Sequence, residues 1–437
     1  MRNLFFVALA ALSLTACSEN ETGSNADSFG MQSASADYSG LCSTPVQTVS
    51  GNITVSTTWT ANTIWEIDGI VNVPSGVTLT IAPGTYIKAK PNSTGATGVL
   101  VVQKGGKLIA NGTVTAPIVF TSYKLLDCST TTTASPGDFG GIVILGDAPT
   151  NTPTTTTIEG LTGSQYYYGG TNAAHNGGSL KYVRIEFAGY DLLSPNSGNE
   201  INGLTLGGVG SGTTIDHVQV SYGKDDSFEW FGGTVNATNL VSFAADDDNF
   251  DFDSGYTGTI TCALALANQN STHSLSGGSP DSNGIELDNN AAGSTATPIT
   301  NPVINNLTIV GARTATSGAL YENAIHVRRN GKLTLNDAVV TGYPVGILLE
   351  TVASAPVNLA HVSFTSVSAH GFTYATASKI GSTTAALVIP GVTSTSTSNP
   401  AAVWGMTQPF FNTAVPAWNV TPRNCGDFKG TWTKYSF

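Results

Sequence analysis

The chain has 437 residues, a formal net charge of −12, and charged side chains at only 11% of its positions. This acidic balance argues against nucleic acid or an anionic lipid surface as an electrostatic partner, because both attract clusters of Lys and Arg. Gly, Ser, Thr and Asn are abundant beside β-branched aliphatic residues, which favours short strands joined by turns over helices.

The first 16 residues have the pattern of a signal peptide. A short positive segment is followed by an apolar run from Leu4 to Leu14, and the run ends in Leu14–Cys17. This last tetrapeptide resembles the lipobox of bacterial lipoproteins. The resemblance implies that Cys17 is the lipidated first residue of a mature chain at the outer membrane or cell surface. The alternative is an ordinary secretory signal that contains a cysteine. Residues 17–45 are polar, with few aliphatic side chains, and we expect a flexible tether there.

From residue 46 onward, apolar and polar residues alternate in short segments separated by Gly and Pro. We expect strands at the segments 67–73, 77–81, 99–102, 107–110 and 118–120. The stretches Val73–Thr85, Gly106–Thr113 and Ala116–Ser122 resemble the opening coils of bacterial cell-surface proteins with a right-handed parallel β-helix, in the pectin-lyase-like superfamily. The resemblance implies an all-β fold, a single-stranded right-handed parallel β-helix.

An internal repeat supports the same fold. The segment Ser221–Trp230 recurs as Ser242–Phe252, a shift of about 21 to 22 residues that is typical of a solenoid. We therefore expect one elongated body over residues 46–390. Residues 391–437 would form a C-terminal linker and an aromatic cap over the open end of the helix, with four large side chains: Trp404, Phe410, Phe411 and Trp418.

Four cysteines remain besides Cys17, and in an exported chain they indicate two disulfides with three possible pairings. We favour Cys42 with Cys128, at the first coils, and Cys262 with Cys425, at the C-terminal segment.

The repeats can be aligned on a strand in which two apolar residues point inward and the residue between them points outward. The outward positions then form one column: Thr205, Glu229, Asp251, Glu286, His326, Leu348 and Thr373. The next outward positions form a second column: Phe231, Asp253, Asp288, Arg328 and Glu350. Acidic turns precede two of these strands, so carboxylates gather on one face.

Carboxylates stacked at the strand spacing, about 4.8 Å, repel one another and need a counter-charge or a proton. A set of oxygen ligands favours a hard cation, and we expect calcium. The expected ligands are Asp225, Asp226, Asp246, Asp247, Asp248 and Asp251. The alternative is a solvated acidic face that binds no metal.

The same face offers candidate catalytic residues: Glu229, Asp251, Glu286, His326 and Arg328. The stretch Ile215–Ser221 with the following Asp225 and Asp226 faintly resembles pectate lyases, which implies a Ca²⁺-binding face and an Arg base. The downstream Arg motif of those enzymes is not recognisable here.

The function that we favour is a non-catalytic lipoprotein of the outer membrane or cell surface. Calcium would stabilise its β-helix, and it would act in adhesion or in binding an extended polysaccharide. A polysaccharide lyase or glycoside hydrolase is the rival function, and a structural spacer is a third.

Overall fold

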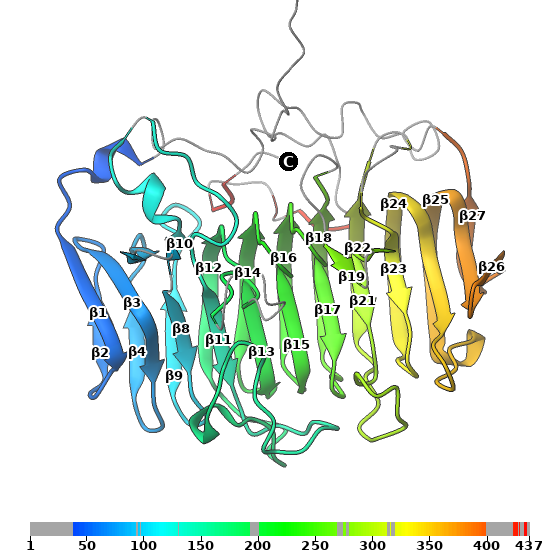
Figure 1. The fold of residues 1–437 in the computed structure, drawn as a ribbon, viewed down its shortest axis with the longest axis horizontal. Helices are drawn as coiled ribbons and strands as arrows, with labels where there is room; N and C mark the ends of the chain where they lie inside the picture. Colours follow the sequence, from blue (N-terminus) through cyan, green and yellow to red (C-terminus); the bar gives the residue numbers. More distant parts are fainter. Residues whose placement is uncertain are drawn as a thin grey trace, which may run out of the picture.

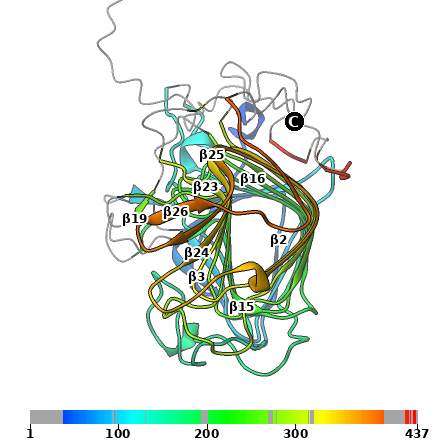
Figure 2. The same cartoon turned by 90° about the vertical axis from the view of Figure 1, so that its right-hand side faces the viewer.

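Alternating apolar and polar residues turn most of the chain into short strands that stack side by side along one axis (Figure 1). The computed structural model describes residues 38–92, 95–96, 98–129, 131–192, 201–268, 274–276, 279–312, 315, 320–398, 423–426, 428 and 432–434. Viewed along the axis, the successive coils superimpose around a common interior (Figure 2). The chain is therefore an all-β parallel β-helix, as expected.

Each coil contributes to three stacks of parallel strands, and pairing runs from one coil to the next. The first stack contains β2 (Thr57–Trp59), β4 (Thr78–Ile81), β9 (Lys107–Asn111) and the initial parts of β12 (Gly178–Glu186), β14 (Thr214–Ser221), β16 (Asn236–Phe243), β18 (Thr259–Leu266), β22 (Val303–Val310), β24 (Leu333–Thr351) and β25 (Val362–Ile380). The second stack contains β1 (Val46–Asn52), β3 (Ile64–Val73), β5 (Tyr86–Ala89), β10 (Ile118–Thr121), the following parts of the seven longer strands, and β27 (Val392–Thr395).

The third stack carries the candidate site. It contains the end of β3, then β8 (Val99–Val102), β11 (Gly141–Leu145), β13 (Leu204–Val209), β15 (Phe228–Gly233), β17 (Phe250–Asp253), β21 (Ile285–Leu287), β23 (Asn323–Val327) and the ends of β24 and β25. The remaining strands are two hairpins, β6 (Pro91–Asn92) with β7 (Gly95–Ala96) and β19 (Leu275–Ser276) with β20 (Ser279–Pro280), and β26 (Thr383–Ala386), which is antiparallel to β25. The described helices are short 3-10 turns: η1 (Ser39–Leu41), η2 (Tyr123–Leu125), η3 (Ser164–Tyr166) and η4 (Leu359–His361).

A bend separates the first stack from the second within each long strand. At the bend one residue has a left-handed backbone conformation, with φ of 51° at Tyr182 and 55° at His217 and at Asn239. Such residues cost free energy unless the surroundings fix them, and here equivalent residues of neighbouring coils lie side by side. The bend turns the chain towards the acidic turns, which lie between the second and third stacks.

Two disulfides fix segments at the periphery of the helix. Cys42 is bonded to Cys128, and Cys262 of β18 is bonded to Cys425. This is the pairing favoured from the sequence. The second disulfide holds a C-terminal segment against the outside of the second stack, where Phe428 and Trp432 are buried.

Two expectations from the sequence concern residues outside the described part of the chain. The cap residues Trp404, Phe410, Phe411 and Trp418 lie there, and so does Cys17 with the signal peptide. Within the described residues, no helix combines the length and hydrophobicity that crossing a membrane requires.

Candidate functional site

The third stack carries the predicted outward column in register. Glu229 of β15 pairs with Asp251 of β17, Asp251 with Glu286 of β21, and Glu286 with His326 of β23. Thr205 and Leu348 extend the column at its two ends. Thr373 does not belong to it, because a register shift in the β24–β25 pairing places Ala377 opposite Leu348.

Aromatic side chains beneath this column fix the direction of the acids. Phe228 stacks on Phe250 with ring centroids 5.5 Å apart, and Trp230 stacks on Phe252 at 4.7 Å. All four rings are buried in the interior of the helix. Because side chains alternate along a strand, the acids between the rings point away from the interior.

Asp226 and Asp248, two of the predicted ligands, belong to a ladder of side chains at the turn before the third stack. The Asp226 amide donates to Asn202 Oδ1 at 3.1 Å, and the Asp248 amide donates to Asp226 Oδ1 at 2.8 Å. The Asn283 amide in turn donates to Asp248 Oδ1, and the Asn323 amide donates to Asn283 Oδ1 at 3.2 Å. One oxygen of each aspartate is thus used to hold neighbouring coils together.

The acidic turns and the column line one pocket of about 470 Å³, which we call the acidic pocket. Its lining residues are Glu159, Lys224, Asp225, Asp226, Glu229, Asp246, Asp247, Asp248, Asp251, Ser274, Leu275, Asp281 and Glu286. All six predicted ligands are among them. Lys224 is the one basic residue in this set, so carboxyl groups dominate the pocket.

Burial makes the charged forms of these carboxyl groups unfavourable. Burial first, and then neighbouring acids, raise the pKa values of Asp226, Glu229, Asp248 and Asp251 well above their ordinary range. Burial likewise raises the pKa of Asp246 to about 8 and that of Asp247 to about 7. Without a cation, several of these groups therefore hold a proton near neutral pH.

Two groups of carboxylates in the pocket have their oxygens within 4.8 Å of one another. One group is Asp225, Asp226 and Asp247, and the other is Asp226, Glu229 and Asp251. The buried atoms Asp247 Oδ1 and Asp251 Oδ1 have no hydrogen-bond partner among the described residues. Oxygen ligands of this kind fit Ca²⁺. Asp246 and Asp248 line the pocket but belong to neither group.

Glu159 and Asp281 also line the pocket, although neither was predicted as a site residue. Glu159 lies in the long segment between β11 and β12, and Asp281 follows the β19–β20 hairpin. Both lie in insertions between coils, where no periodicity indicates the position of a side chain.

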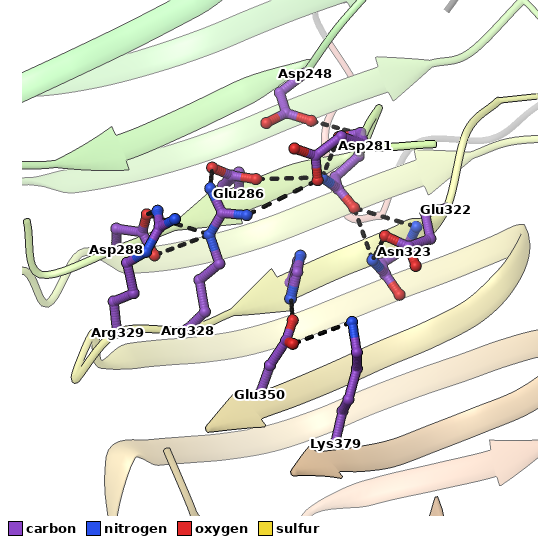
Figure 3. A network of polar contacts seen from close by, with 12 residues as sticks. Asp248, Asp281, Glu286, Asp288, Glu322, Asn323, Arg328, Arg329, Glu350 and Lys379 are labelled. Atoms are coloured by element: carbon purple, nitrogen blue, oxygen red, sulfur yellow. Dashed lines mark hydrogen bonds and ion pairs between the residues drawn. The ribbon is translucent and has the colours of Figure 1, made fainter. Parts of the chain in front are cut away.

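The other candidate catalytic residues form a polar network beside the pocket (Figure 3). Arg328 Nε lies 3.0 Å from Asp288 Oδ1, and Arg328 also contacts Glu286. Glu350, expected from the sequence near Arg328, instead accepts a hydrogen bond from Lys379 and contacts His326. Arg328 is therefore a charge partner of the acids around it.

Comparison with known proteins gives a family and a fold. The model of the family described as "Pectate-lyase like beta helix domain" matches residues 51–420. No curated protein sequence matches the chain.

Two solved structures resemble the chain at low sequence identity. Pectate lyase Pel9A is 13% identical with a TM-score of 0.38, over 89% of this chain and 91% of that one. The full-length tailspike protein 2 of Escherichia coli O157:H7 bacteriophage CAB120 is 12% identical with a TM-score of 0.33. That match covers 71% of this chain but only 39% of the tailspike.

Proposed function

Because the chain belongs to the pectate-lyase-like β-helix domain family, we propose that it is a Ca²⁺-stabilised β-helix that binds an extended polysaccharide at the cell surface. Calcium would occupy the acidic pocket, held by Asp226 with Glu229 and Asp251 or with Asp225 and Asp247. A Ca²⁺ ion takes six to eight oxygen ligands, so positions remain for sugar hydroxyl or carboxylate groups.

The observation that carries the proposal is the buried, unpartnered oxygen of Asp251 within a group of three carboxylates. Two unit charges about 4.8 Å apart repel by roughly 3 to 4 kcal/mol at an effective dielectric constant of about 20. A divalent ion replaces this repulsion by attraction. The predicted solvated acidic face does not account for the burial of Asp226, Glu229 and Asp248.

Calcium titration with matched variants tests the site. Glu229→Gln and Asp251→Asn each remove a ligand charge while keeping the shape of the side chain, so we expect Ca²⁺ affinity to fall at least tenfold. Calorimetry measures the affinity, and a glycan array with Ca²⁺ or with chelator then measures polysaccharide binding.

Asp68→Asn is the control, because Asp68 is half-exposed and pairs with Lys90 far from the pocket. The Asp68→Asn variant should bind Ca²⁺ with the same affinity as the unmodified chain. Equal Ca²⁺ affinity in Asp251→Asn, Glu229→Gln and the control would refute the site.

A polysaccharide lyase is the second candidate, favoured by Lys224 in the lining of a pocket suited to Ca²⁺. A lyase needs a base beside the bound sugar, and lysine can serve as one. An enzyme would form unsaturated product from an acidic polysaccharide and lose this turnover in Lys224→Ala without losing thermal stability, whereas a binding protein would form none.

The membrane anchor remains a proposal from Leu14–Cys17 alone. Cys17→Ala should release the chain from membranes and abolish labelling with a radioactive fatty acid. Labelling that persists in Cys17→Ala would contradict the proposed lipid anchor.

A further inference from the structure

A second cluster of potential ligands lies at the end of the acidic column, around His326. A ring nitrogen of His326 and one carboxylate oxygen each of Asp281 and Glu322 lie within 4.8 Å of one another. The three residues come from different places: Asp281 precedes β21, Glu322 precedes β23, and His326 lies within β23. Figure 3 shows Asp281 and Glu322 close together, with Glu350 on the other side of the network.

The contact between His326 and Glu350 shows which ring nitrogen is left for a metal ion. Nε2 lies 2.8 Å from Glu350 Oε2, and Lys379 Nζ lies 3.0 Å from Glu350 Oε1. Glu350 Oε2 can accept a hydrogen bond from Nε2–H, and this tautomer leaves the lone pair of the imidazole on Nδ1.

Nδ1 is buried and has no hydrogen-bond partner among the described residues. The whole residue is only 2% exposed, so solvent does not supply a partner freely. A buried imidazole nitrogen normally has a partner, and an unused lone pair beside two carboxylates is the arrangement that a metal ion completes.

From this geometry we propose that His326 Nδ1, Asp281 and Glu322 form a second metal site, which takes Zn²⁺ or a similar divalent transition metal. One nitrogen and two oxygens suit Zn²⁺, which binds His and carboxylate ligands at about 2.0 to 2.2 Å and often keeps a fourth position open. Ca²⁺ prefers oxygen ligands alone. Glu350 is the outer carboxylate that orients the histidine. Its ligands are separate from those proposed for calcium, although Asp281 also lines the acidic pocket.

The nearest competing charge is Arg328, whose Nη1 lies 3.8 Å from Asp281 Oδ1. Its Nε is bonded to Asp288 at 3.0 Å, and Arg328 also contacts Glu286. These bonds hold the guanidinium on the side of β21, so Asp281 can turn towards His326 to bind a metal.

A Zn²⁺ titration of the mature chain with saturating Ca²⁺ present tests the proposal. We expect uptake of one Zn²⁺ per chain, and uptake of Co²⁺ at the same site with the visible absorption of a nitrogen-ligated ion. His326→Leu should abolish both, and it is suited to the fold because Leu348 occupies the paired position on the next coil. Glu322→Gln should also abolish uptake, and Glu350→Gln, which changes the orientation of the histidine, should weaken it about 10- to 100-fold.

Asp251→Asn separates this site from the acidic pocket, because it should lose Ca²⁺ binding and keep Zn²⁺ binding. The reverse is expected for His326→Leu, whose Ca²⁺ affinity also shows that it is folded. The proposal is overturned if the unmodified chain takes up no Zn²⁺, or if folded His326→Leu binds Zn²⁺ as the unmodified chain does. It is also overturned if Asp251→Asn loses both metals.

Discussion

Individual carboxyl groups in the acidic pocket oppose folding unless they are neutralised. Asp247, for example, has a pKa raised to about 7 by burial and by neighbouring charges, of which Asp281 is the foremost acid. In the unfolded chain the same group titrates near 4. Folding therefore favours its protonated form, and a bound cation would supply the missing charge instead.

This shift predicts how stability depends on pH in excess chelator. The folded chain binds more protons than the unfolded chain between about pH 4 and the raised pKa values, which are about 7 for Asp247 and Asp253 and about 8 for Asp246. Stability should therefore fall as pH rises from about 5 to about 8 and then level off. Thermal unfolding in chelator measures the fall.

Some histidines act in the opposite direction. Burial lowers the pKa values of His175, His361 and His370, so the contribution of these residues to the stability of the folded chain rises with pH. Asp247→Asn corrects for them, because only the acid changes. The fall between pH 5 and pH 8 should be smaller in Asp247→Asn than in the unmodified chain, and an equal fall in both would contradict the account.

At the scale of elements, the turn ladder joins coils and supplies pocket residues at once. The equivalent positions are Asn202, Asp226, Asp248, Asn283 and Asn323. The asparagines show that a neutral amide suffices for the ladder, so the negative charges at Asp226 and Asp248 are not needed for it. This supports a separate role for those charges.

Asn283→Ala tests the ladder without changing any charge. It leaves the Asn323 amide without its acceptor, and an unsatisfied buried donor costs about 1 to 3 kcal/mol. Chemical unfolding should show a loss of this size. Asn305→Ala, which removes a bond between two half-buried side-chain amides at 3.0 Å, should cost less. Equal losses of unfolding free energy in the two variants would mean that the ladder stabilises the fold no more than an ordinary side-chain hydrogen bond does.

The strands themselves were predictable where the period of two is clean. The segment 99–102 is β8 as expected, and the outward column from Thr205 to Leu348 is in register. The shift at Thr373 was not predictable, because a bulge changes the register without changing the apolar pattern. Strand β18 was missed, because a long insertion replaces the acidic turn that marks the repeat after β14 and β16.

For the whole molecule, the sequence predicted which residues share a face but not what covers that face. The segment between β11 and β12 packs over the third stack, where Ile158, Tyr166 and Tyr168 are buried, and it brings Glu159 to the pocket. The acidic face, which the sequence suggested would be exposed, is therefore part of a pocket in which the pKa values of the carboxyl groups are raised. Periodicity cannot indicate the path of an irregular loop, so burial of the acids could only be found in three dimensions.

Calcium binding is the central claim, and the most direct test is thermal unfolding of the chain beginning at Ser18, with Ca²⁺ and with excess chelator, near pH 8. A ligand that binds only the folded chain stabilises it by about 2.7 kcal/mol at 100 times its Kd. We predict a melting temperature that rises with Ca²⁺ in the unmodified chain and in Asp68→Asn, but not in Asp251→Asn. No rise in the unmodified chain at millimolar Ca²⁺ would contradict the account and leave the pocket acids neutralised by protons alone.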